Sequence, residues 1–214
     1  RFSPFMFKGT SFNTGGYSAQ YGQALSSVLI LNSRDLPTRS STDISVMTAG
    51  VGAGHTHLWK KASLGINVSY INLNPNFAVI NQAPGWVKPP EVKEFSLNYK
   101  IKTSATGILK FYSNSSFSNS SLTYHDLDSA KKDLFTMNNQ QHYINSSYNG
   151  AINDKWLLFS GFAYTNNRDK IKIETDDIFR LDVMSHGRLG VTRLLGKYSS
   201  LKVGGDIYEK GGLN

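Results

Sequence analysis

Two histidines and two acidic groups are the side chains of this chain with the most potential for chemistry. His55 and His57 lie two positions apart, so on an extended strand both rings share one face and could hold a metal ion. A metal site needs three or four ligands, and neither a carboxylate nor a third histidine lies nearby in the sequence. We therefore expect a surface histidine pair, and no metal site.

The acidic groups give little support for catalysis. His125, Asp126 and Asp128 lie in a polar stretch that could contact a ferric chelate or a cation, but that is more typical of a solvated loop. The acidic residues of 174–177 lack the central glycine and terminal glutamate of a calcium loop. The glycines of 50–54 match a dinucleotide loop only weakly, and no nucleophile elbow or phosphate loop is present. The sequence predicts no enzymatic activity and no cofactor.

Composition narrows the class of protein. The 214 residues include no cysteine, which excludes a disulfide framework and a thiolate metal site. The net charge of +8 raises nucleic acid as a partner, but the basic residues are scattered and no nucleic-acid-binding motif accompanies them, so none is expected. No apolar run approaches the ~18 to 20 residues of a membrane helix.

Alternation of apolar and polar residues dominates the chain from Ala62 onward, which predicts strands. The clearest strands are expected at 62–70, 94–102, 179–191 and 201–207, with weaker ones at 108–115, 142–150 and 156–164. Tight turns are expected at 104–106, 153–155 and 196–198, and longer polar loops at 74–91, 117–137 and 166–177. Thr42 to Trp59 is expected to form one or more strands in which Gly50, Gly52 and Gly54 mark a bulge or a close backbone approach.

The polar positions of these strands favour a membrane barrel over a soluble sandwich. They are rich in Ser, Asn, Gly and Lys, which suits a hydrated lumen, and the expected strands approach the ~9 to 11 residues that cross a bilayer. Aromatic residues gather near the strand ends, as in the interfacial girdles of outer-membrane barrels. These residues are Trp59, Tyr70, Phe111, Tyr112, Trp156, Tyr164 and Tyr208. Counting strands back from the long loops places Trp59–Lys61 at the end of the sheet that carries the short turns. The strand before it would then run toward the short turns, so the direction of the first strand stays open.

A glycine-rich stretch near the N-terminus, Gly15 to Asn32, reads GGYSAQYGQALSSVLILN. It resembles the last plug strand of TonB-dependent outer-membrane receptors, in the form common in Bacteroidota. Gln20 replaces the acidic residue usual in that family. The matching residues are Gly15, Gly16, Tyr17, Ser18, Ala19, Tyr21, Gly22, Ala24 and Ser26.

The resemblance implies a fragment of a nutrient importer in the bacterial outer membrane. Residues 1–33 would end the plug domain, 34–41 would be a linker, and 42–214 would be the first strands of an antiparallel transmembrane β-barrel. The function implied is import of a ferric siderophore, another metal complex or a glycan. The partners implied are outer-membrane lipid, the TonB complex through a missing N-terminal part, and a surface lipoprotein.

Contact with the imported small molecule or glycan is expected in the long loops, at Trp86, Tyr124, His125 and Asp126. Two other interpretations stay open. A small stand-alone outer-membrane barrel would pair its terminal strands. A soluble all-β carbohydrate-binding module would bury its apolar faces against each other.

Overall fold

The computed structural model describes residues 7–13, 28–33, 35–80, 85–125, 132–196 and 198–213. The chain divides into two compact units, Arg1–Thr38 and Arg39–Asn214. This division falls within the segment 34–41 that the sequence marks as a linker. The assignment of residues 1–33 to a plug domain stays a prediction.

The first unit contains two antiparallel strands, β1 (Phe7–Asn13) and β2 (Val28–Ser33). Phe12 pairs with Leu29, and the register shifts once, between Phe7 and Gly9. Because β2 coincides with the apolar run at the end of the glycine-rich stretch, that run does form a strand.

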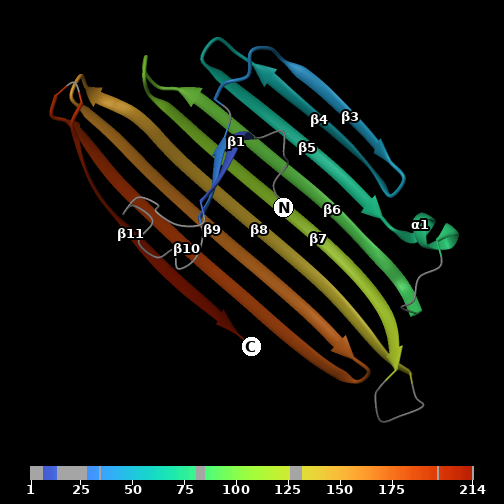
Figure 1. Cartoon of the computed structure of the whole chain (residues 1–214). Coiled ribbons are helices and arrows are strands. Elements are labelled where there is room, and N and C mark those ends of the chain that lie inside the picture. The colour runs from blue at the N-terminus through green and yellow to red at the C-terminus, as the bar shows by residue number, and fades with distance from the viewer. Residues whose placement is uncertain are drawn as a thin grey trace. The chain divides into compact units, whose positions relative to one another are not determined.

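The second unit is a single antiparallel sheet of nine strands in which each strand pairs with its neighbours in sequence (Figure 1). The sequence prediction of an all-β, antiparallel class is therefore confirmed. The one described helix is α1 (Asn74–Val79), with Pro75 in its first turn. The strands are β3 (Ser41–Met47), β4 (Gly50–Leu58), β5 (Ala62–Asn72), β6 (Gly85–Lys102), β7 (Ile108–His125), β8 (Lys132–Asn153), β9 (Trp156–Ile173), β10 (Asp176–Leu194) and β11 (Ser200–Leu213).

The two ends of this sheet differ. At the turn end (upper left in Figure 1), β4 joins β5, β6 joins β7, β8 joins β9 and β10 joins β11. The tight turns predicted at 104–106 and 153–155 are confirmed there. The Asn153 side chain caps the second of these turns, accepting hydrogen bonds from the backbone N–H groups of Lys155 (3.0 Å) and Trp156 (3.1 Å). We call the opposite end, which carries α1, the far end.

The long polar loops predicted at the far end are largely wrong, because the strands continue through them. β6 begins at Gly85, β7 runs to His125, and β9 and β10 are separated only by Glu174 and Thr175. The strands reach 22 residues in β8, well above the length expected from the sequence. Ser, Thr and Asn can extend a strand here because their side chains bond across it, as between the hydroxyls of Ser121 and Thr136 at 3.0 Å.

The segment from Thr42 to Trp59 is a hairpin, β3 and β4, with only Thr48 and Ala49 between the strands. This early connection resolves the direction of the first strand, which runs toward the far end. The register between the strands is regular, so the bulge considered for the glycines of β4 is wrong. The close approach is confirmed at Gly50, where an added Cβ would collide with the carbonyl oxygen of Tyr70.

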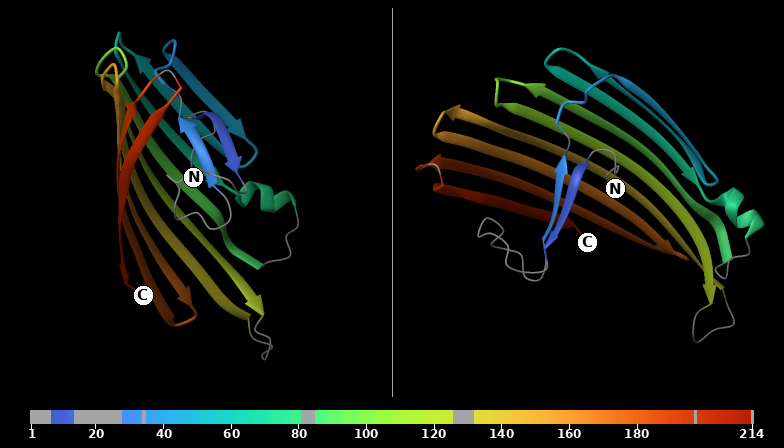
Figure 2. Two further views of the ribbon diagram at one scale, coloured as in Figure 1. Left: turned by 60° about the vertical axis from the view of Figure 1, so that its left-hand side comes forward. Right: turned by 45° about the horizontal axis from the view of Figure 1, so that its top comes forward.

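The sheet is twisted and curved, and it is not closed (Figure 2). β3 and β11 form its two edges, and each pairs with one neighbour only. Tyr112 is the single buried hydrophobic side chain among the described residues, and no described side chain is fully buried. The nine-stranded sheet therefore has no hydrophobic core of its own.

Candidate functional site

The pairing register sorts the side chains of the sheet onto two chemically different faces, because residues directly opposite in an antiparallel pair share a face. The row that contains Ile66 runs through Leu97, Ser113, Ile144 and Tyr164. We call its side the apolar face. The exposed hydrophobic residues on this face include Ile44, Val46, Val51, Val68, Phe95, Phe117, Phe162, Leu189, Val203 and Ile207.

The apolar face is apolar over only part of each long strand. On β9 it carries Trp156, Leu158, Phe162 and Tyr164 with one interruption, Ser160. Beyond Tyr164, toward the far end, the same face becomes polar. We call the zone from the turn end to this change the apolar band, and its span along β9 matches the ~9 to 11 residues that cross a bilayer.

The same change occurs on β6 and β7. From the turn end, the apolar face of β6 carries aliphatic and aromatic residues as far as Phe95, and then Lys93 and Glu91. On β7 the change follows Phe117, after which Asn119 and Ser121 occupy this face. The band is therefore a property of adjacent strands and not of β9 alone.

Aromatic residues mark both borders of the band. Trp59, Tyr148 and Trp156 lie near the turn end, and Tyr70, Phe117 and Tyr164 lie on the side of the far end. A cation accompanies one aromatic ring at each border. The Arg193 guanidinium lies 5.3 Å from the centre of the Trp156 ring, and the Lys93 ammonium lies 6.0 Å from that of Tyr70.

Lys93 also forms an ion pair just outside the band. Its Nζ lies 3.2 Å from a carboxylate oxygen of Glu91, and the hydrogen bond holds the pKa of Glu91 below its ordinary value. Lys88 approaches the same carboxylate at 3.6 Å. Charged groups are thus accommodated on this face immediately beyond the aromatic border, where water can solvate them.

The opposite side of the sheet, which we call the polar face, is lined by hydrogen-bonded side chains. Asn139 donates to Asn167 Oδ1 over 2.7 Å and to Asp169, and the Asn167 amide also donates to Asp169 over 3.3 Å. Asn114 donates to Glu94 over 2.7 Å. The residues buried on this face are Ser63, Ser96, Lys100, Tyr112, Asn114 and Asp169.

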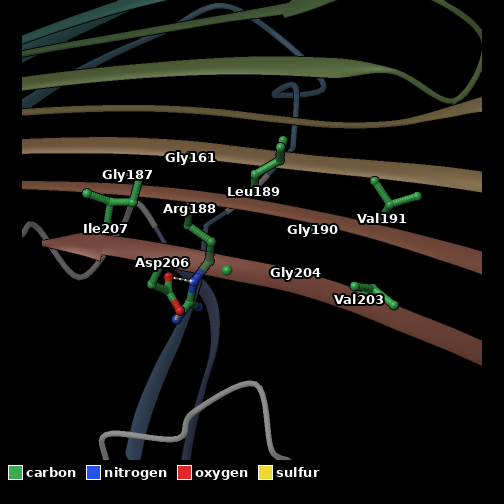
Figure 3. Close-up of a pocket in the computed structure, with 11 residues that line it drawn as sticks. Gly161, Gly187, Arg188, Leu189, Gly190, Val191, Val203, Gly204, Asp206 and Ile207 are labelled. Carbon is green, nitrogen blue, oxygen red and sulfur yellow. Dashed lines mark hydrogen bonds and ion pairs between the residues drawn. The ribbon is translucent and has the colours of Figure 1, made fainter.

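A second cluster on the polar face joins β10 to β11. Asp206 accepts hydrogen bonds from Arg188 and interacts with His186 at 3.0 Å, and His186 stacks on Tyr208 with ring centres 4.0 Å apart. Figure 3 shows Arg188 pointing toward Asp206. Because Asp206 satisfies the charge of Arg188, this cluster joins two strands and is a poor anion site.

A shallow depression of about 640 Å³ lies between the same two strands (Figure 3). Leu189, Val191, Val203 and Ile207 line it from the apolar face. Its floor includes Gly205, around which an added Cβ would meet nothing within 4 Å. Arg188 and Asp206 also contribute to its lining, but most of the lining is apolar and suits hydrocarbon.

The residues predicted to contact a ligand are only partly brought together. Trp86 lies in β6 and not in a loop, and its ring centre is 5.6 Å from that of Phe77 in α1. Tyr124 lies near the far end of β7, which ends at His125. Trp86 and Tyr124 thus both lie at the far end of the sheet, on adjacent strands. Asp126 lies outside the described residues.

The plug-strand residues Gly15, Gly16, Tyr17, Ser18, Ala19, Tyr21 and Gly22 lie outside the described residues as well. His55 and His57 are on the apolar face of β4, with ring centres 6.4 Å apart. His55 bonds to the Thr42 hydroxyl at 2.8 Å, and His57 packs edge-on against Trp59. Across the described part of the chain, no three His, Cys, Asp or Glu side chains are grouped to hold a metal ion.

Sequence reasoning missed one group of exposed cations. Arg168, Lys170 and Lys172 follow Tyr164 at alternate positions on the apolar face of β9, in a segment expected to be a loop. The sequence alone does not reveal them, because apolar residues lie at even positions in 156–164 but at odd positions further along, at Ile171 and Ile173.

Comparison with known proteins finds no matching family, no matching curated protein and no matching solved structure. Any functional conclusion therefore depends on the geometry of the sheet and on the sequence. In the described part of the chain, no helix is long and apolar enough to cross a membrane.

Proposed function

We propose that the second unit forms part of the wall of a β-barrel in the bacterial outer membrane, and that the chain belongs to a TonB-dependent receptor that imports a scarce nutrient. The observation that carries the membrane part is the apolar band. It runs across adjacent strands of one sheet face, has aromatic residues at both borders, and lies opposite a face of hydrogen-bonded polar groups.

Lipid is the environment that fits the apolar face. Ile44, Val46 and Ile207 each expose more than three quarters of their surface, at 78%, 79% and 78%. Soluble monomers rarely leave contiguous apolar patches above a few hundred Å² in water. Each Å² of apolar surface removed from water contributes roughly 25 cal/mol, so a band across the whole sheet would be strongly stabilised by hydrocarbon.

The polar face fits a hydrated lumen. Lipid would leave Asn, Asp and Lys groups unsolvated, at a cost of several kcal/mol for each unpaired group. On this face Asn139, Asn167 and Asp169 satisfy one another, and Lys100 is almost completely buried at 7% exposure. An antiparallel membrane barrel shows this arrangement, with apolar residues outside and polar residues inside.

The strand lengths fit a barrel that extends beyond the bilayer. At about 3.3 Å per residue, the 22 residues of β8 span roughly 70 Å, against a hydrocarbon core of about 30 Å. The polar extensions all lie toward the far end. The far end would therefore be the extracellular side, and Trp86 and Tyr124 would be exposed there to an arriving ligand.

The TonB-dependent type is supported by the resemblance of Gly15 to Ser33 to a plug strand. The proposed substrate is one of the three classes that the resemblance implies: a ferric siderophore, another metal complex or a glycan. The TonB complex and a surface lipoprotein are the protein partners proposed.

Fractionation and uptake together test this proposal. In the producing bacterium, the protein should be found in the outer-membrane fraction, and deletion of its gene should abolish uptake of one radiolabelled ferric chelate or one fluorescent glycan. Dissipation of the proton gradient should abolish the same uptake in the parent strain. Recovery in a soluble fraction would favour a carbohydrate-binding module, and an outer-membrane protein without effect on uptake would favour a structural barrel.

A further inference from the structure

Two of the cations on β9, Arg168 and Lys170, line a depression together with residues of the neighbouring strands. Arg168 lies between Gln140 of β8 and Leu181 of β10, and Lys170 lies between Asn138 and Phe179 on the same two strands. A depression of about 170 Å³ is lined by Asn138, Gln140, Arg168, Lys170 and Phe179. We call these five residues the cationic depression.

The cationic depression lies directly beyond the border of the apolar band. On the apolar face of β9, Arg168 is the second residue beyond Tyr164, after Asn166, and Lys170 is the third. If the band lies in hydrocarbon, which is the proposed function on which this inference rests, the two cations lie at the level of the lipid headgroups.

Within the described ranges of the chain, no acid pairs with the cations of this depression. Arg168 and Lys170 are exposed, and neither has an ion pair or hydrogen bond to another described side chain. Asp169, between them in sequence, is on the polar face with Asn139. Asp182 also lies on the polar face and pairs with Arg180 at 2.9 Å. Asp177, the nearest acid on the same face, is opposite Lys172.

We propose that the cationic depression binds the phosphate of a membrane lipid headgroup. The Arg168 guanidinium offers a planar pair of donors, Lys170 adds a point charge, and the amides of Asn138 and Gln140 add further N–H donors. Phe179 and Leu181 offer apolar contact on the β10 side, beside the start of the acyl chains. This combination recognises a phosphate attached to hydrocarbon better than a phosphate in solution.

A titration in detergent tests this inference. The whole chain, dissolved in a non-ionic detergent, is titrated with phosphatidic acid, and binding is followed by native mass spectrometry. The double variant Arg168→Gln with Lys170→Gln should bind about thirtyfold more weakly, at about fivefold per cation removed. Both substitutions keep a long polar side chain on an exposed strand position, so folding should be retained.

A matched control separates a site from diffuse charge. Lys60→Gln with Lys61→Gln removes the same charge from the exposed turn at the turn end and should leave binding unchanged. An equal loss in both double variants would overturn the site. Inorganic phosphate at the same concentration should not compete, and full competition would overturn the assignment to a lipid.

Flotation with phosphatidylcholine vesicles separates this inference from the proposed function. A chain that does not associate with vesicles at all contradicts the membrane proposal, and the lipid site with it. A chain that inserts, but whose Arg168 and Lys170 variant binds phosphatidic acid as tightly as the parent, contradicts the lipid site alone.

Discussion

The side-chain amide of Asn72 donates a hydrogen bond to the hydroxyl of Tyr70 over 3.1 Å. The same pair recurs on β9, where the Asn166 amide approaches the Tyr164 hydroxyl at 3.5 Å. Both strands run toward the far end, and both pairs lie at that border of the apolar band. The asparagine satisfies the polar tip of a ring whose body lies on the apolar side, which is how tyrosine is used at a membrane interface.

A charge introduced at the level of the apolar band should be costly on the apolar face and not on the polar face. Leu189 and Met184 are both exposed residues of β10, at 57% and 44%, but they lie on opposite faces. In phosphatidylcholine vesicles, Leu189→Arg should lower the free energy of unfolding by about 2 to 4 kcal/mol, because arginine would face hydrocarbon. Met184→Arg should cost less than about 1 kcal/mol, because it faces a hydrated surface. Urea unfolding measures both, and equal losses would argue against a lipid-facing band.

The three tryptophans should report three positions relative to the bilayer. Trp59 and Trp156 lie at the turn-end border of the band, whereas Trp86 lies at the far end. Variants that keep one tryptophan each, with phenylalanine at the other two positions, separate the signals. Brominated lipids should quench Trp59 and Trp156, and aqueous acrylamide should quench Trp86 more strongly. Quenching of Trp86 by brominated lipids, and of Trp59 and Trp156 by acrylamide, would contradict the position assigned to the apolar band.

The network around Asp169 should stabilise the far half of the sheet. Asp169→Ala removes the acceptor of the Asn167 amide and one of the two acceptors of the Asn139 amide, at a position only 8% exposed. We expect a loss of about 1 to 3 kcal/mol in the free energy of unfolding. Asp176→Ala, at the exposed start of β10, is the control and should change it by less than about 0.5 kcal/mol. Similar values for the two variants would mean that the network adds no stability.

Two consecutive glycines of β11 should respond differently to a methyl group. A Cβ at Gly204 would lie 2.6 Å from the Leu189 carbonyl oxygen and 3.0 Å from the Cα of Gly190. A Cβ at Gly205 would meet nothing within 4 Å. Gly204→Ala should therefore weaken the pairing of β10 with β11 by about 1 to 3 kcal/mol, and Gly205→Ala should be tolerated. Hydrogen exchange of the β11 amides measures the difference, and equal protection in both variants would contradict the close approach of the two strands at Gly204.

The sequence predicts the strand class well wherever apolar and polar residues alternate, as at 62–70 and 94–102, which lie within β5 and β6. It fails at the far end. Residues 117–137 and 166–177 are rich in Ser, Asn and charged side chains and read as loops, yet most of them are strand. Their pairing is set by neighbouring strands already in register, and this context outweighs local propensity.

The residues of the candidate site also divide into those that the sequence places and those that it does not. The aromatic residues Tyr70, Trp156 and Tyr164 could be placed at borders from the sequence, because each lies near the end of an alternating run. Arg168 and Lys170 could not, because only the cross-strand register shows that they share a face with Phe162. Trp86 was expected in the polar loop 74–91, but β6 includes it. The register shifts of β6 between Trp86 and Glu91 show how a strand accommodates Pro89 and Pro90.

A cysteine scan along β9 tests the central claim most directly, since the chain has no cysteine of its own. Spin labels placed singly from Trp156 to Ile173, in the chain reconstituted in phosphatidylcholine vesicles, report collisions with oxygen in lipid and with a nickel chelate in water. We predict oxygen access at every second position up to Tyr164, and nickel access on both faces from Asn166 onward. Nickel access on both faces along the whole strand, or protection of both faces from both probes, would contradict an apolar band in contact with lipid.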